Sequence, residues 1–300
     1  MSGDGWFVDG DFEASRARVR TGTAAEPADW PTEAVEAGFA ADRSAYYDAL
    51  HEATVEATTA AVRERERADD QQLVHAVRAL DDCRRTANEL AERLAEWAGT
   101  VDPDAGSGVE YARSLAGGER SGDDVDETPG KDVGDPIQSL AARVTDLADE
   151  ADSLEAYVER RAPTVAPNLS ALAGPLLAAR LLSLAGGLET LAKKPSGTVQ
   201  VLGAEEALFA HLRGHATSPK HGIIFTHEAV RGTRLEDRGS AARALAGKLT
   251  IAARIDHYSG DYRPELEAEL AERLETIRAR AEGDGDGGRD GGRDRGGDDE

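Results

Sequence analysis

Two stretches of the chain repeat apolar residues at alternating intervals of three and four, which is the spacing of a coiled-coil seam. The first stripe runs from Leu73 to Trp97 and the second from Ile137 to Val158. An acidic, Gly- and Asp-rich connector over residues 99–134 joins them, so the chain can reverse direction between the two stripes. The pattern therefore predicts an antiparallel coiled-coil hairpin over residues 69–162. Its candidate self-association positions are Leu73, Leu80, Leu90, Leu94, Leu140, Leu147 and Leu154.

Helical spacing of apolar residues continues outside the hairpin. Asp135 and Pro136 are suited to the N-cap and first turn of the second hairpin helix, and the prolines between Pro163 and Pro167 should end it. Further helices are predicted over Asp42–Arg67, Leu169–Leu191, Glu205–Leu212, Ser240–Ile255 and Pro264–Ala281. The predicted fold class is thus all-α.

The same patterns divide the chain. Residues 1–68 form a reduced N-terminal region ending in a helix, anchored by Trp6, Phe7, Trp30 and Phe39, with Asp42 as the helix cap. The hairpin follows over 69–162, then a helical domain over 163–263 and a C-terminal helix over 264–281. Residues 282–300 are predicted to be a disordered acidic tail, because from Gly283 onward they contain only Gly, Asp, Glu and Arg.

Composition agrees with helices packed on thin stripes, because alanine is abundant and aromatic residues make up only 5% of the chain. A net charge of −23, with arginine replacing nearly all lysine, is typical of a protein adapted to a high-salt cytoplasm. No run reaches the roughly 18 apolar residues that suggest a membrane span, and no cationic, apolar leader is present. Cys83 is the only cysteine and fits a small apolar core residue better than a redox group. We therefore expect a cytoplasmic protein with no membrane partner.

One segment departs from the acidic background. Residues 163–263 contain twelve Lys or Arg and eight Asp or Glu, a balance of +4, while the rest of the chain carries −27. Four of the five lysines lie here. Because positive charge is kept in one place, the segment predicts an anionic partner.

Within that segment, the cations gather at three predicted turns. The first holds Lys193 and Lys194, the second Lys220 and His221, and the third holds Arg231, Arg234 and Arg238. Cations at helix ends are also ordinary partners of the helix dipole. Three such turns in one segment favour phosphate contacts and hence nucleic-acid binding.

Common catalytic, nucleotide-binding and metal-binding motifs are absent from the sequence. It contains no GxGxxG after a strand pattern, no GxSxG, no HExxH and no cysteine pair, so we predict no catalytic residue and no cofactor. His211 and His215 are four residues apart, with His221 and His227 nearby, but no carboxylate or thiolate completes a zinc site. Solvated or RNA-facing histidines are favoured over a metal site, and a metal-dependent nuclease is the weakest of three hypotheses.

The basic segment resembles the Nop-domain family, in particular the scaffold proteins of box C/D small ribonucleoproteins that guide 2′-O-methylation of RNA. The resemblance rests on VAPNLSALAGPLLAARLLSLAGGLETLAKKPSGTVQVLGAEEALFAHL, SPKHGIIFTHEAV and RGSAARALAGKLTIAARIDHYSG. Upstream, YYDALHEATVEA and QQLVHAVRALDDCRRTANELAERLAEW are similar to the family's first coiled-coil region.

The resemblance implies a helical scaffold without a catalytic centre. The implied partners are a box C/D small RNA, a ribosomal-protein-like protein that binds its kink-turn, the methyltransferase fibrillarin, and a second copy of the chain. Together with the basic turns, the resemblance makes six residues RNA-binding candidates: Lys220, His227, Arg231, Arg238, Arg243 and Lys248.

Some positions depart from the family pattern. Glu206 and Ala210 stand where the family usually has Lys and Arg, and Ser240 stands where a lysine is usual. The N-terminal region and the connector are also short, which implies a reduced fibrillarin-docking surface centred on residues 30–62. The alternative hypothesis is therefore a coiled-coil protein adaptor whose Nop-like domain no longer binds RNA.

Overall fold

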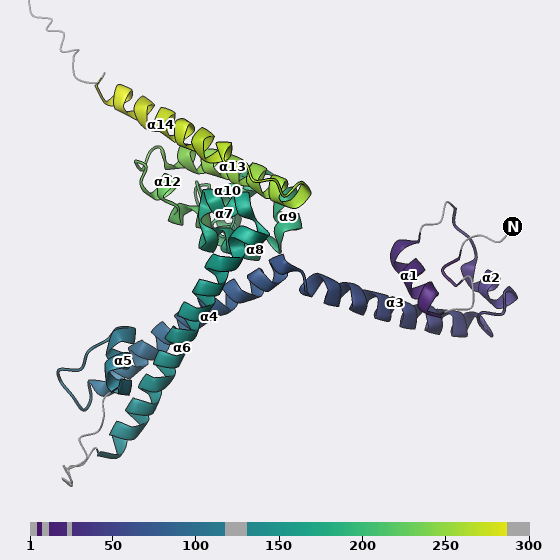
Figure 1. Cartoon of the computed structure of the whole chain (residues 1–300), viewed down its shortest axis with the longest axis horizontal. Coiled ribbons are helices and arrows are strands. Elements are labelled where there is room, and N and C mark those ends of the chain that lie inside the picture. Colours follow the sequence, from purple (N-terminus) through teal and green to yellow (C-terminus); the bar gives the residue numbers. More distant parts are fainter. Residues whose placement is uncertain (1–4, 8–11, 23–25, 118–130, 287–300) are drawn as a thin grey trace, which may run out of the picture. The chain divides into compact units, whose positions relative to one another are not determined.

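The computed structural model describes residues 5–7, 12–22, 26–117 and 131–286. Over these residues the chain forms helices and turns without any strand, which confirms the all-α prediction (Figure 1). It divides into two compact units, Met1–Gln71 and Gln72–Glu300. Each unit is considered by itself.

The N-terminal unit contains α1 (Phe12–Thr21), α2 (Trp30–Glu36) and α3 (Arg43–Glu66). Asp42 caps α3 as predicted, because its carboxylate accepts a hydrogen bond from the Ala45 N–H at 2.8 Å. Phe7 and Tyr46 are buried in a small aromatic cluster, and the Trp6 indole donates to the Tyr46 hydroxyl at 3.1 Å. The large anchors predicted from the sequence thus pack onto the first turns of α3.

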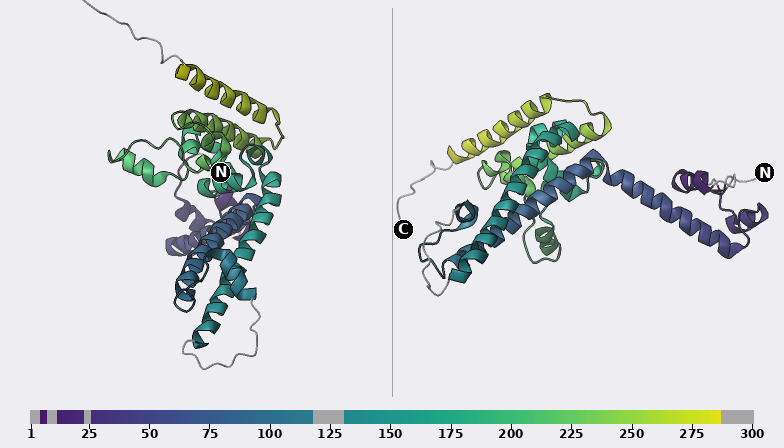
Figure 2. Two further views of the ribbon diagram at one scale, coloured as in Figure 1. Left: turned by 90° about the vertical axis from the view of Figure 1, so that its left-hand side faces the viewer. Right: turned by 60° about the horizontal axis from the view of Figure 1, so that its bottom comes forward.

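The two heptad stripes form the predicted antiparallel hairpin, made by α4 (Asp69–Ala98) and α6 (Lys131–Val165). The two helices lie side by side in both Figure 1 and Figure 2. Leu73 at the start of α4 shares a core with Val158 near the end of α6, whereas Leu94 near the end of α4 shares a core with Ile137. An ion pair between Arg84 and Glu155 joins the helices between these cores.

The ends of α6 differ from the prediction. The helix begins at Lys131, so Pro136 lies inside it, and it runs through Pro163 as far as Val165. Pro163 has no N–H to donate to the Glu159 carbonyl, so one hydrogen bond is missing in the last turn, two residues before the helix ends. The break comes at Ala166, which precedes Pro167 and leaves the helical region of backbone space.

The connector contains a helix that the sequence interpretation missed. α5 (Gly108–Gly117) packs on the open end of the hairpin, where Val109 and Leu115 contact the core formed by Leu94 and Ile137. The Arg113 guanidinium, an α5 side chain, lies 2.6 Å from the Asp149 carboxylate of α6. The apolar residues of this short stretch are too few to stand out by themselves, and they gain stability only by covering the hairpin core.

The helical domain after the hairpin consists of short helices around α13. They are α7 (Pro167–Ala173), α8 (Pro175–Ala185), α9 (Leu188–Lys193), α10 (Ser196–Val201), α11 (Glu205–Leu212), the 3-10 helix η1 (Ile223–Thr226), α12 (Glu228–Arg231), α13 (Arg238–Tyr258) and α14 (Glu265–Asp286). The single helix predicted over Leu169–Leu191 is wrong, because Gly174 (φ 77°) and Gly186 (φ 90°) adopt left-handed backbone angles that end α7 and α8.

α13 is the central helix of this domain. Small and branched residues on its buried faces, such as Ala242, Leu245 and Ala253, contact the surrounding helices. The buried face of α14 is formed by Leu266, Leu270, Leu274 and Ile277, as the sequence predicts. α14 ends at Asp286, so the first residues of the predicted disordered tail are helical, and residues 287–300 lie outside the described part of the chain.

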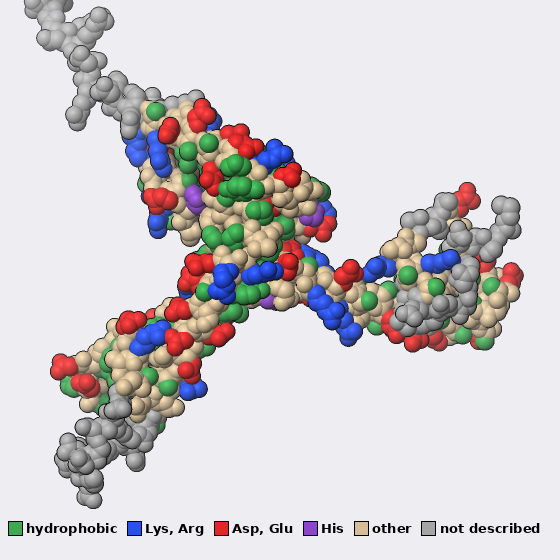
Figure 3. Space-filling model, viewed as in Figure 1, with side chains coloured by type: hydrophobic (Ala, Val, Ile, Leu, Met, Phe, Trp, Pro, Cys, Tyr) green, Lys and Arg blue, Asp and Glu red, His purple; other side chains and the backbone are tan. Residues whose placement is uncertain are grey.

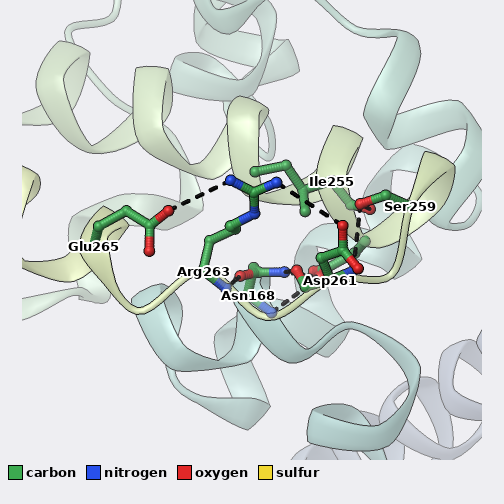
Figure 4. A network of polar contacts seen from close by, with 7 residues as sticks. Asn168, Ile255, Ser259, Asp261, Arg263 and Glu265 are labelled. Carbon is green, nitrogen blue, oxygen red and sulfur yellow. Dashed lines mark hydrogen bonds and ion pairs between the residues drawn. The ribbon is translucent and has the colours of Figure 1, made fainter.

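A polar network fixes the first turn of α7 against the end of α13 (Figure 4). The Asp256 carboxylate accepts hydrogen bonds from the backbone N–H groups of Asn168 (3.0 Å) and Leu169 (2.8 Å). The Asn168 side chain donates to the Asp261 carbonyl and accepts from the Arg263 N–H at 2.7 Å. The network therefore joins the hairpin exit, α13 and the turn into α14.

Among the described residues, no single helix is both long enough and apolar enough to span a membrane. Taken together, α7 and α8 are long and apolar enough, but the two helices meet at an angle of 116°.

Candidate nucleic-acid interface

Cations and an aromatic ring meet at the N-terminal end of α13. The His221 ring stacks on Phe225 with centroids 4.6 Å apart and planes inclined by 20°. The Arg238 guanidinium carbon lies 5.3 Å from the centre of the same Phe225 ring. Phe225 thus contacts both a stacked histidine ring and an arginine guanidinium.

Arg238 is held in place by the loop that precedes it. Its Nε donates to the Thr233 carbonyl at 3.1 Å, and one Nη donates to the Arg231 carbonyl at 3.3 Å. With two donors engaged by the backbone and a ring beside it, Arg238 acts mainly as a clamp on the loop after α12. Its charge remains at the surface because the side chain is only half-buried.

Lys220 is exposed beside this stack. Its carbonyl accepts a hydrogen bond from the Gln200 side chain at 2.7 Å, and its aliphatic stem lies over Gly239 in the first turn of α13. The neighbouring Gly222 is required by close approach, because a Cβ there would lie 2.0 Å from the Leu202 carbonyl oxygen. The backbone of this turn therefore has a fixed conformation, which sets the position from which the Lys220 side chain extends.

The His227 ring is half-buried and hydrogen-bonded to the backbone, so it does not face open solvent. It is the N-cap of α12, where its Nδ1 accepts from the Ala229 N–H at 3.1 Å. Burial is the main cause of a lowered pKa at His227, opposed by a hydrogen bond with the backbone of Leu172. The ring is therefore a neutral structural link between α12 and α7 rather than an open stacking surface.

The other candidates lie further along the surface. Arg231 is exposed and pairs with Glu228 at 3.0 Å, while Lys248 forms an ion pair with Glu269 of α14. Arg243 is exposed and lines a groove of about 430 Å³ between α13 and α14. Lys248 and Arg273 line the same groove, so three cations from two helices face it.

The structure thus brings Lys220, Arg231 and Arg238 together at one end of α13 and places Arg243 and Lys248 in the adjoining groove. Sequence interpretation missed Phe225 and Arg273. The spacing of His221 and Phe225 gives a weak signal for the ring contact, whereas the position of Arg273 depends on how α14 packs against α13.

The remaining candidates separate into two groups by burial. Leu73, Leu80 and Leu94 of the predicted self-association set are fully buried within the hairpin of one chain. Leu90, Leu140, Leu147 and Leu154 are half-buried. No group of His, Cys, Asp and Glu that could hold a metal ion occurs among the described residues, and His211 Nδ1 lies 3.0 Å from the Ala216 carbonyl.

The fold and this surface define a helical protein in which a coiled-coil hairpin carries a domain with a cationic, aromatic surface. The family model described as "snoRNA binding domain, fibrillarin" matches residues 119–277. The chain belongs to this Nop family.

Individual relatives agree with this membership. A NOP5 family protein from Methanocaldococcus jannaschii is 35% identical over 82% of this chain and 66% of its own length. Nucleolar protein 58 of Scheffersomyces stipitis is 33% identical over 70% of this chain and 48% of its own length. The chain thus spans about half to two thirds of these relatives. The crystal structure of a fibrillarin/Nop5p complex superposes with a TM-score of 0.50 and 25% identity, covering 93% of this chain and all of that one.

These relatives correct one expectation. The sequence suggested a cytoplasmic location, but the relatives from Scheffersomyces stipitis and Schizosaccharomyces pombe are both named nucleolar proteins. The cytoplasmic assignment is therefore contradicted.

Proposed function

We propose that this chain is a non-catalytic scaffold that binds a box C/D guide RNA and recruits fibrillarin for 2′-O-methylation of RNA. The observation that carries the proposal is the surface at the N-terminal end of α13. There Lys220, Arg231 and Arg238 gather around the Phe225 stack, within a chain whose net charge is −23. The matched family is a snoRNA-binding one, and a similar solved structure is a complex with fibrillarin.

RNA recognition at this surface combines two kinds of contact. The Lys220 and Arg231 head groups are exposed and suited to phosphate oxygens. The His221 pKa is lowered by burial and then by the charge of Arg238, so this ring is neutral near pH 7 and offers an aromatic edge rather than a charge. A small protein that has already bound the kink-turn of the RNA would present the folded RNA to this surface.

Fibrillarin recruitment is assigned to the N-terminal unit. Tyr47, Val55 and Val62 are exposed by 53%, 49% and 53%, and their spacing of eight and seven residues places them on one face of α3. This face lies away from Tyr46, Ala53 and Ala57, which are buried inside the unit. It is an apolar surface suited to another protein.

Self-association is assigned to the hairpin. Leu147 and Leu154 on α6 remain half-buried when the hairpin has formed, so apolar surface is left for a second copy. Two copies would hold two RNA surfaces and two fibrillarin surfaces in one particle.

Binding of the kink-turn RNA, with its kink-turn protein present, tests the RNA contact. We expect Lys220→Ala and Arg231→Ala to weaken assembly at low salt and to have little effect at molar salt, because phosphate pairing is screened. Arg143→Ala is the matched control, since Arg143 is exposed and paired with Asp146 three residues away, as Arg231 is with Glu228. If the Lys220 and Arg231 variants bind like wild type at every salt concentration, the protein-adaptor hypothesis replaces this one.

A further inference from the structure

A second group of cations lies where α9 ends. Lys193 and Lys194 occupy the last residue of α9 and the residue after it. Arg254 of α13 reaches the same place, because its Nε donates to the Ala192 carbonyl at 3.1 Å. Three cations from two helices therefore converge on one helix end.

An exposed aromatic ring adjoins these cations. Tyr258 is 68% exposed and lies one helical turn beyond Arg254 on α13. Its ring makes an edge contact with His257 at 4.6 Å between centroids. The pKa of Lys193 is raised mainly by Glu189 and to a smaller degree by Tyr258, which agrees with the two side chains being neighbours.

Contacts within the fold explain only part of the positive charge in this cluster. Lys193 is paired with Glu189 at 2.5 Å, but both side chains are more than half exposed, so the pair exchanges readily with another anion. The Lys194 side chain makes no hydrogen bond or ion pair within the described residues. Pro195 and the first residues of α10 (196–198) lie beside it and are exposed, which leaves room for a ligand.

This cluster is distinct from the surface described above. Arg238 and Arg254 are separated by sixteen residues of continuous helix, or about 24 Å. Figure 1 shows α12 and α9 on opposite sides of the helical domain. One phosphate group cannot contact both places, but one RNA strand can.

We propose that Lys193, Lys194, Arg254 and Tyr258 form a second RNA contact that takes a single-stranded stretch of the RNA held at the other end of α13. The inference rests on the proposed function. The cations would pair with phosphates, and the Tyr258 ring would stack on an unpaired base, the combination by which proteins hold single strands. An acidic peptide would use the lysines but would leave the exposed ring without a role.

Binding to three RNAs tests this contact, with the full chain and the kink-turn protein present. The first RNA is the kink-turn stem alone, the second carries a single-stranded arm long enough to span α13, and the third carries the same arm as a duplex. We expect the single-stranded arm to increase affinity for wild type by roughly tenfold. Lys194→Ala and Tyr258→Ala should each reduce this gain while leaving stem binding unchanged.

Arg143→Ala and Phe209→Ala are the controls, because each removes an exposed cation or ring elsewhere and should retain the gain. If the stem binds but the arm adds nothing, or the variants keep the gain, the second contact is wrong and the proposed function stands. An equal gain from the duplex arm, or displacement of the arm by polyglutamate that depends on Lys194 alone, also overturns it. If wild type does not bind the stem, both proposals fail together.

Discussion

At the scale of single residues, His227 illustrates how the same side chain can be placed in a family motif and still have a structural role. Its Nδ1 caps α12, and its ring is largely withdrawn from solvent. The motif predicts a functional position but says nothing about the hydrogen bonds of the ring. The exposed cations Lys220 and Arg231 are therefore better tests of RNA contact than His227.

Replacement of His227 should thus change stability before it changes recognition. His227→Ala removes a cap and should lower the free energy of unfolding by about 0.5–2 kcal/mol, whereas His227→Asn should restore most of it. Thermal or denaturant unfolding measures the difference, with His215→Ala as an exposed control. A stability equal to wild type for His227→Ala would contradict the capping role.

The pH dependence of stability follows from the burial of the His227 ring. The folded-state pKa of His227 is lowered below the ordinary 6.5, so the unfolded chain binds a proton more readily than the folded one. Its contribution to stability is therefore complete above pH 6.5 and is lost as the pH falls from there towards the folded-state pKa. Wild type should lose more stability than His227→Asn over this window, with His221 contributing equally to both.

At the scale of elements, the hairpin contains two long helices with a regular apolar repeat and one short helix without such a repeat. The heptad stripes predict α4 and α6 well, because each apolar residue of a long stripe repeats the same signal. α5 and the three-helix division of residues 167–193 were missed because each piece is only one to three turns long. Their ends depend on single glycines and on what each piece covers.

Self-association of the hairpin can be tested at a half-buried position. Leu147→Glu should convert a dimer to a monomer in sedimentation at high salt without loss of helix content, because a charge cannot be buried between copies. Ser139→Glu adds the same charge at an exposed position of α6 and should remain dimeric. Leu94→Ala, inside the single-chain core, should instead destabilise the hairpin by about 2–5 kcal/mol. A monomeric wild type would rule out this assignment.

At the scale of the whole molecule, acidic charge is the background on which the cationic surfaces stand out. On the face shown in Figure 3, acidic side chains lie along the hairpin and beside α14. Lys220, Lys248, Lys193 and Lys194 are four of the five lysines of the chain, and all belong to the helical domain. Under the proposed function, this acidic background would repel RNA elsewhere and leave these places as its contacts.

The proposed recruitment of fibrillarin would give the N-terminal unit its role in the particle. Val55→Glu and Val62→Glu should each reduce co-purification of the methyltransferase several-fold while RNA binding is unchanged, because a charge opposes burial of the α3 face. Ala60→Glu places the same charge on another exposed side of α3 and is the control. Undiminished fibrillarin in both valine variants would place docking elsewhere.

The sequence by itself determined the helical class, the hairpin and its direction, and the segment that holds the positive charge. These features depend on periodicity and charge, which accumulate over many residues. Only the tertiary structure decided which cations meet. Packing of α9 and α14 against α13 places Arg254 beside Lys193 and Arg273 beside Arg243, although 61 residues separate the first pair and 30 the second. Such contacts depend on how the helices are arranged in space, and no local pattern encodes them.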